Sequence, residues 1–245
     1  SQAGQSNAWR TGIDQIGQIY VGDGLKDKKD ENGRLLTTLS IDVTGDATFN
    51  AGQLVNAGGA SRLVAQGDMA FNAVNTGYQT NAIGDSNNYY KVGQTQDVGS
   101  VLVTSGDTFI KGNNVTGTAT TIQSGGNTII NADNNIAFKE GRATQNLSTA
   151  NRTTDKGFLS SKTTQDRYDM TSDTAIGSHI DGDKVSITAK NDVHLTATDV
   201  ISDHGTYVKA GNNLTIDAAE NRYSESSSHD KKKSGVFGTG SGLDF

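Results

Sequence analysis

The sequence of 245 residues contains no cysteine and no proline. Without cysteine, neither disulfide bonds nor thiolate metal sites can form. Disordered linkers are usually rich in proline, whereas a proline inside a stacked β-sheet removes a backbone hydrogen-bond donor. The absence of proline therefore favours an ordered β-structure over a disordered chain.

The chain also has few hydrophobic residues, 33% in all, and a mean hydropathy of -0.53. A chain this polar is either disordered or a repetitive β-structure in which stacked neighbours supply most of the stability. No apolar run approaches the roughly 18–20 residues that span a bilayer. The polar N-terminus has no secretory leader, which for a secreted protein predicts a piece of a longer chain. The net charge of -6 gives no support for a nucleic-acid partner.

Internal repetition is the strongest positive signal. A Gly-Asp or Gly-Asn pair followed by a short apolar segment recurs, as in 45–51, 67–73, 106–110, 126–132, 182–189 and 211–218. Short segments of alternating apolar and polar residues also recur every seven or eight residues in this part of the chain. Their apolar positions include Val185, Val193, Val200, Tyr207 and Leu214. Alternation sends the outer two residues of each segment to one face and the middle one to the other. In Val193–Leu195, for example, His194 should point outward.

Three such strands make a coil of about 21 residues, which predicts a three-sided solenoid with parallel pairing between successive coils. Glycine and asparagine accept left-handed backbone conformations, so 125–127, 134–135 and 211–213 suit the turns between faces. Asparagine and threonine can form ladders from coil to coil.

Three polar stretches interrupt the coils, at 74–100, 143–175 and 219–245. The last two resemble copies, because 136–142 matches 216–222 and 156–159 matches 234–237 at offsets of 80 and 78. We therefore predict a unit of about 80 residues that combines coils with an extended hairpin, with Gly157 and Gly235 near the tips. Disordered loops are the alternative interpretation of these excursions.

The order and spacing of the motifs in the second half resemble the haemagglutinin repeat region of filamentous haemagglutinins and of the stick proteins of contact-dependent growth inhibition. The resemblance rests on 174–178, 182–193, 210–216 and 232–235, is good from about 135 to 245, and is looser from 40 to 135. It implies a right-handed parallel β-helix and export through an outer-membrane two-partner secretion transporter. It also implies secretion to the surface of a Gram-negative bacterium, with a periplasmic stage before deployment.

Catalytic chemistry has little support. Asp181 with Asp183, or Asp166 with Asp169, could serve a lyase or glycosidase, but hydrolysis needs two carboxylates at a defined separation. These aspartates recur with the coil, which favours roles in turns. The histidines are scattered, and the Gly-Asp pairs do not follow a calcium-binding repeat. We expect no catalytic, cofactor-binding or metal-binding residues and no cofactor.

The best candidates for function are apolar and basic residues in the excursions, because exposed apolar patches often mark contacts. The candidate contact residues, for a target-cell surface or membrane, are Phe158, Leu159, Val236, Phe237, Lys231, Lys232 and Lys233. The alternative is that the apolar residues fold back on the flank of the rod and that the lysines are simply solvated.

The sequence as a whole predicts an all-β chain, a right-handed parallel β-helix with β-hairpin excursions. The expected division is a lead-in at 1–40, coils at 41–142 with the excursion at 74–100, a hairpin at 143–175, coils at 176–218 and the start of another excursion at 219–245. The predicted function is a structural filament segment of a large exoprotein used in adhesion or contact-dependent toxin delivery. A carbohydrate-active β-helix enzyme and a disordered extracellular linker are the alternatives.

Overall fold

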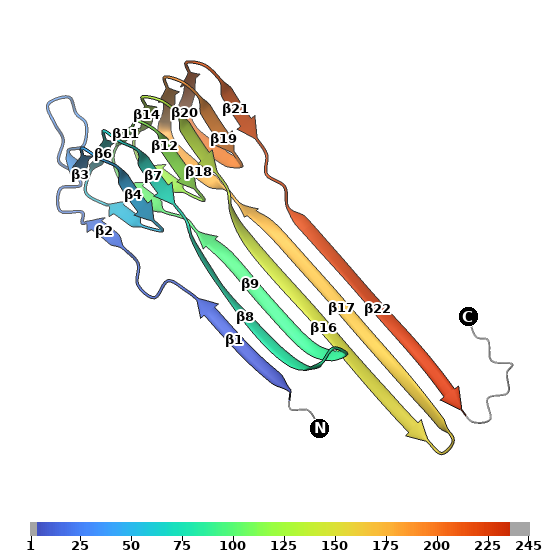
Figure 1. Ribbon diagram of the computed structural model, residues 1–245. Coiled ribbons are helices and arrows are strands. Elements are labelled where there is room, and N and C mark those ends of the chain that lie inside the picture. The colour runs from blue at the N-terminus through green and yellow to red at the C-terminus, as the bar shows by residue number, and fades with distance from the viewer. Residues whose placement is uncertain (1–3, 236–245) are drawn as a thin grey trace.

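The computed structural model describes residues 4–235, which form 22 strands and no helix. Most strands build a solenoid of stacked coils, and the remainder form a long single-layer sheet that extends from one corner of it (Figure 1). Within the described residues there is accordingly no helix long and apolar enough to cross a membrane. The predicted fold class, an all-β parallel β-helix with hairpin excursions, is confirmed.

The solenoid has three faces, each a ladder of parallel strands. The first face contains β2 (Gln18–Val21), β5 (Gln53–Asn56), β10 (Val101–Thr104) and β13 (Thr121–Ser124). The second contains β3 (Thr37–Val43), β6 (Ala60–Ala65), β11 (Thr108–Gly112) and β14 (Thr128–Ala132). The third contains β4 (Ala47–Asn50), β7 (Met69–Asn72), β12 (Val115–Thr118), β15 (Ile136–Lys139), β19 (Val193–Thr196) and β21 (Leu214–Asp217). Two longer strands, β18 (Ser178–Ala189) and β20 (Thr198–Ala210), continue across the first and second faces.

The strand register confirms the predicted coil length. Coils without an inserted hairpin align Ala47 with Met69, Val115 with Ile136 and Thr108 with Thr128. These offsets are 22, 21 and 20 residues. Each strand therefore pairs with its equivalent one coil away.

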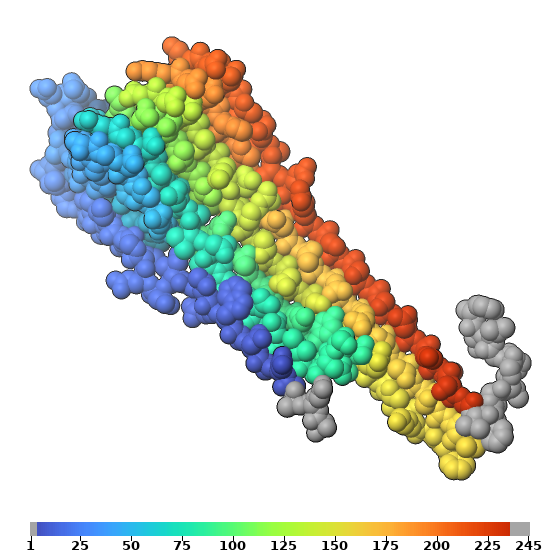
Figure 2. All heavy atoms as spheres, in the orientation of Figure 1, coloured from blue at the N-terminus to red at the C-terminus, as the bar shows by residue number. Residues whose placement is uncertain are grey.

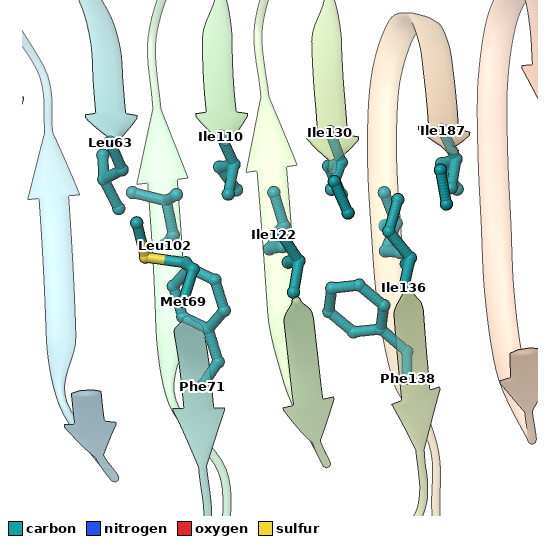
Figure 3. Packing of buried hydrophobic residues seen from close by; sticks show 14 of the residues in the cluster. Leu63, Met69, Phe71, Leu102, Ile110, Ile122, Ile130, Ile136, Phe138 and Ile187 are labelled. Carbon is teal, nitrogen blue, oxygen red and sulfur yellow. The ribbon is translucent and has the colours of Figure 1, made fainter. Parts of the chain in front are cut away.

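The core is a single column of aliphatic and aromatic side chains inside the coils (Figure 3). Val185, Ile187, Val193 and Leu195 are at most 3% exposed, whereas the side chain of His194 is 50% exposed. The predicted inward and outward positions of these strands are confirmed. One of the regularly spaced apolar residues does not face the core: Tyr207 aligns with Ser186 on the outer surface and is 59% exposed. Its neighbour Val208 aligns with Ile187 and packs against the core instead.

Stacked Asp and Asn side chains form a ladder at the corner before the third face, where the sequence predicted Asn and Thr. In each step, an Asp or Asn Oδ1 accepts the backbone N–H of the corresponding residue in the next coil. The N···O distances are 2.7–3.1 Å along Asp46, Asp68, Asn114, Asn135, Asp192 and Asn213. Because turn amides have no strand partner, this ladder satisfies donors that would otherwise need water.

The expected left-handed conformation of the corner glycines was wrong. Gly125, Gly126 and Gly211 do not have positive φ. Glycine is required there because the coils stack closely: a Cβ at Gly126 would overlap the Asp107 carboxylate, and one at Gly211 would overlap the Lys190 carbonyl oxygen. The left-handed conformation occurs instead at three alanines, Ala51, Ala119 and Ala197, with φ of 48°, 47° and 45°.

These three alanines mark the corner at which the excursions leave the solenoid. The tight turns from the third to the first face contain Ala51 after β4, Ala119 after β12 and Ala197 after β19. The alternate coils leave the solenoid at the same corner. After β7 the chain forms the hairpin of β8 (Val74–Asp85) and β9 (Asn88–Val98). After β15 it forms the hairpin of β16 (Gly141–Gly157) and β17 (Ser160–Ile176). After β21 it continues into β22 (Arg222–Gly235). Hairpins therefore alternate with tight turns, one for every second coil.

The excursions form one antiparallel sheet of six strands in the order β1-β8-β9-β16-β17-β22, in which β1 spans Gln5–Thr11 (Figure 1). Neighbouring strands lie about 4.8 Å apart in any sheet. Two coils therefore advance the solenoid by the width of one two-stranded hairpin, so successive hairpins meet edge to edge. Figure 2 shows the result as a continuous blade below the coils. The sequence predicted the hairpins but not their pairing.

Candidate contact surface at the tip of the excursion sheet

The hairpin of β16 and β17 extends beyond the β8–β9 hairpin to the far end of the blade, and β22 runs alongside it (Figure 1). The two strands pair without a break from Gly141 and Ile176 at the solenoid to Gly157 and Ser160 at the tip. Phe158 and Leu159 alone form the connecting turn, and Gly157 lies beside it as the sequence predicted. A two-residue turn on a strand pair of this length holds its side chains far from the solenoid.

The two turn residues are apolar and exposed. Phe158 is 95% exposed and Leu159 is 42% exposed, so neither folds back on the flank of the rod. Leu159 has a φ of 69°, a left-handed conformation that is costly for a residue with a branched side chain. An exposed phenylalanine beside a strained leucine gains nothing for folding, which favours a role in binding.

Lysines surround this turn. Lys233 lies directly opposite Lys162 across the β17–β22 ladder, and Lys231 lies opposite Thr164 on the same face of the sheet. Repulsion from Lys162, and then from Lys233, lowers the pKa of the Lys231 ammonium group. Lys232 lies opposite Thr163 and points to the other face, so the three consecutive lysines do not act as one cluster.

The tip is positive in an acidic chain. Segments 152–163 and 230–235 contain six Lys or Arg and two Asp, a formal charge of +4 in a chain whose net charge is -6. Like charges opposite each other destabilise a sheet pair, so this arrangement also contributes nothing to folding. The combination of exposed apolar side chains with uncompensated positive charge suits an acidic or amphipathic surface.

Two of the predicted contact residues, Val236 and Phe237, lie outside the described residues. Gly235 lies opposite Ser160, level with the turn. Sequence reasoning missed Lys162, which completes the cluster with Lys231 and Lys233. Its position depends on the pairing of two excursions, and no local pattern in the sequence reveals that pairing.

Three of the four carboxylates considered for catalysis contact a side chain on a neighbouring strand, whereas Oδ1 of the fourth, Asp181, is buried without a hydrogen-bond partner among the described residues. Asp166 and Asp169 are three positions apart, so they lie on opposite faces of β17. Asp166 contacts His229, and Asp169 contacts Ser148. Asp183 contacts His204, and burial raises the pKa of the Asp181 carboxyl. Residues 4–235 contain no group of three or more His, Asp or Glu side chains that could hold a metal ion.

Comparisons with known proteins find relatives by sequence. Residues 157–244 match the hemagglutinin repeat family. The chain is 34% identical over 148 residues to the 16S rRNA endonuclease CdiA of Enterobacter cloacae, a match that covers 51% of this chain and 4% of that protein. It is 26% identical over 253 residues to the tRNA nuclease CdiA-2 of Burkholderia pseudomallei, covering 96% of this chain and 8% of that protein. No solved structure gives a significant match.

The chain thus spans only 4% to 8% of the length of these relatives. Their names describe nucleases, but the likeness is confined to a short stretch of very long proteins. That stretch includes the repeats whose coils and excursions are described above.

Proposed function

We infer that this chain, which carries the haemagglutinin repeats of the filamentous haemagglutinin and contact-dependent growth inhibition family, is a stem segment of a large bacterial exoprotein. The exoprotein serves in adhesion or in contact-dependent toxin delivery. The observation that supports this proposal most directly is the repeat of two coils and one hairpin, because such a unit lengthens a rod without needing a globular core.

In this proposal the segment itself performs no chemistry. Each of its four histidines contacts an aspartate on a neighbouring strand, and its buried apolar side chains form one cluster inside the coils. A nuclease activity, where the full protein has one, would belong to another part of the chain. The segment would be secreted through an outer-membrane two-partner secretion transporter and displayed on a Gram-negative cell, after a periplasmic stage.

The tip of the excursion sheet is the part that we propose to contact a target-cell surface. Its proposed contact residues are Phe158, Leu159, Val236, Phe237, Lys231, Lys232 and Lys233, together with Lys162. Exposed apolar groups and positive charge at the end of a rigid hairpin support this role, since they match the negative charge and the apolar layer of a membrane surface.

The test is binding of the purified, labelled chain to bacterial and epithelial cells. Two tip variants are compared with wild type: Phe158→Ser, and the triple substitution of Lys162, Lys231 and Lys233 by Gln. The matched controls are Ile201→Ser, which removes a 56% exposed apolar residue from the solenoid, and the substitution of Lys26, Lys28 and Lys29, three exposed lysines of the lead-in, by Gln.

Saturable binding that is lost in both tip variants and retained in both controls is the expected result. Binding that is equal in wild type and tip variants would contradict the contact role of the tip. The same conclusion would follow if the folded chain bound neither cell type, and recognition would then belong to other parts of the exoprotein.

A further inference from the structure

A hollow lies at the opposite end of the blade, where β1, the loop that follows it and the start of the β8–β9 hairpin meet. Its volume is about 440 Å³, within the range of small-ligand sites. Its floor is the sheet face that carries Arg10, Tyr78, Gln94 and Gln96, and its wall is the loop that carries Ile13 and Ile16. None of these residues belongs to the tip.

The strand register explains why these side chains converge. Arg10, Tyr78 and Gln94 occupy one row across β1, β8 and β9, because Arg10 aligns with Tyr78 and Tyr78 with Gln94. Gln96 lies two residues along β9 and therefore on the same face. The loop after β1 then brings Ile13 and Ile16 over this face as it leads toward the solenoid.

The Thr76 hydroxyl of the hollow donates to the Gln96 carbonyl oxygen, but three polar side chains of the hollow, Arg10, Gln94 and Gln96, are not paired within the described part of the protein, in contrast to those on the other face. There, Trp9 donates to Gln79, Gln79 donates to Asn81, and Asn81 donates to Asn7, at 2.9–3.3 Å. Within residues 4–235 the guanidinium of Arg10 has no ion pair, and the side-chain amides of Gln94 and Gln96 have no hydrogen bond. No aspartate or glutamate lines the hollow, although the chain is acidic overall.

We propose that this hollow binds an acidic saccharide, a short chain of sugar rings that carry carboxylate groups. The guanidinium of Arg10 would pair with a carboxylate through two parallel hydrogen bonds. The ring of Tyr78, which is 41% exposed, offers a flat apolar surface to the C–H face of a sugar. The amides of Gln94 and Gln96 both donate and accept, as neighbouring sugar hydroxyls require.

The composition of the hollow distinguishes this ligand from simpler ones. A small anion would use Arg10 but not the aromatic floor or the apolar wall. A purely apolar ligand would leave a guanidinium and two amides without partners, which is unfavourable once water is excluded. A saccharide with carboxylates uses all three kinds of group.

The experiment is a calorimetric titration of the whole chain with trigalacturonate. Its methyl ester, which has the same rings without charge, and acetate, which has the charge without rings, are the comparison ligands. The site variants are Arg10→Gln and Tyr78→Ala. Their matched controls are Arg222→Gln and Tyr207→Ala, an exposed arginine and an exposed tyrosine far from the hollow. Thermal melts verify that every variant is folded.

The expected result is saturable binding of trigalacturonate that weakens about tenfold or more in each site variant and is unchanged in the controls. The ester and acetate should both bind at least about tenfold more weakly than the acid. Equal affinity in wild type and Arg10→Gln would overturn the proposal, as would equal affinity for acid and ester. So would acetate binding as tightly as the saccharide, or no saturable binding at millimolar ligand. Because the tip variants leave the hollow intact, these results are independent of the cell-binding experiment.

Discussion

At the scale of single residues, alternation along each short strand decides which side chains form the core. Leu195 and Val193 face inward with 3% and 1% exposure, and His194 between them faces water. Both inward residues belong to the apolar cluster inside the coils, so a charged side chain in either place would leave water without gaining a partner. Single inward positions are therefore sensitive, whereas their outward neighbours tolerate change.

The first prediction compares these neighbours. Leu195→Asp should lower the free energy of unfolding by more than about 3 kcal/mol, because it removes buried apolar surface and buries an unpaired charge. His194→Gln should change it by less than about 1 kcal/mol, since only an exposed contact with Asp217 is lost. Urea unfolding followed by circular dichroism measures both. Equal midpoints for Leu195→Asp and wild type would show that the register is wrong.

All four histidines contact an aspartate on a neighbouring strand. The pairs are His179–Asp199, His194–Asp217, His204–Asp183 and His229–Asp166. Three of them join β20 or β21 to the preceding coil, and the fourth joins β22 to β17. The last coil and the last described strand are therefore held partly by histidine–aspartate contacts.

The second prediction concerns pH. A hydrogen bond with Asp183, and then its charge, raise the pKa of His204; Asp203 raises it further, while Lys184 and slight desolvation oppose the shift. Because the folded pKa is raised, the stabilisation is fully present below the unfolded value of about 6.5 and is lost as the pH rises through the folded value. The difference in Tm between wild type and His204→Gln should therefore be larger at about pH 5.5 than at about pH 8.5. Asp183→Asn should reproduce this trend, and a difference that does not vary with pH would contradict the assignment.

At the scale of elements, the corner between the third and first faces decides whether the chain turns or leaves the solenoid. Tight turns place an alanine in the left-handed conformation, at Ala51, Ala119 and Ala197. That conformation is unfavourable for alanine and more so for a β-branched residue. The remaining corners avoid the tight turn by extending into β8, β16 and β22.

The third prediction tests the tight turn at Ala197, which is only partly buried. Ala197→Gly should stabilise the chain by up to about 1 kcal/mol, because glycine adopts the left-handed conformation without strain although it loses more entropy on folding. Ala197→Val should destabilise it by about 1–2 kcal/mol. Thermal unfolding of the two variants measures the effect. The opposite order, with valine more stable than glycine, would rule out a strained corner.

The elements themselves could largely be predicted from the sequence, because coil length, strand alternation and hairpin copies are local patterns. The sequence could not reveal that glycines such as Gly126 are needed for close stacking, since this depends on Asp107 in the neighbouring coil. For the same reason, the candidate site was predicted only in part. Phe158 and the lysines of β22 stand out in the sequence, but Lys162 joins them only through the β17–β22 ladder, in which it pairs with a residue 71 positions later.

At the scale of the whole molecule, the repeat joins two coils to one hairpin, and their dimensions match because strand spacing is the same in both sheets. The solenoid and the blade therefore lengthen together. Arg10 of β1 occupies one row with Tyr78 and Gln94 of the β8–β9 hairpin, more than 60 positions away in the sequence. Binding surfaces on the blade are consequently assembled from segments that are distant in the sequence.

The final prediction separates the blade from the rod. Deleting residues 140–176 joins Lys139 to Gly177, which would then occupy the position that Ala119 has between β12 and β13. The offset between Ile136 and Val193 falls from 57 residues to 20, the length of an ordinary coil, so the solenoid should still fold. β22 would lose its partner β17, and trypsin should cleave at Lys231–Lys233 much faster than in wild type, while cleavage at Lys209, which is paired with Thr188 in the solenoid, stays unchanged. Global unfolding would mean that the hairpin is needed to hold the coils together, and unchanged cleavage would mean that β22 does not depend on β17.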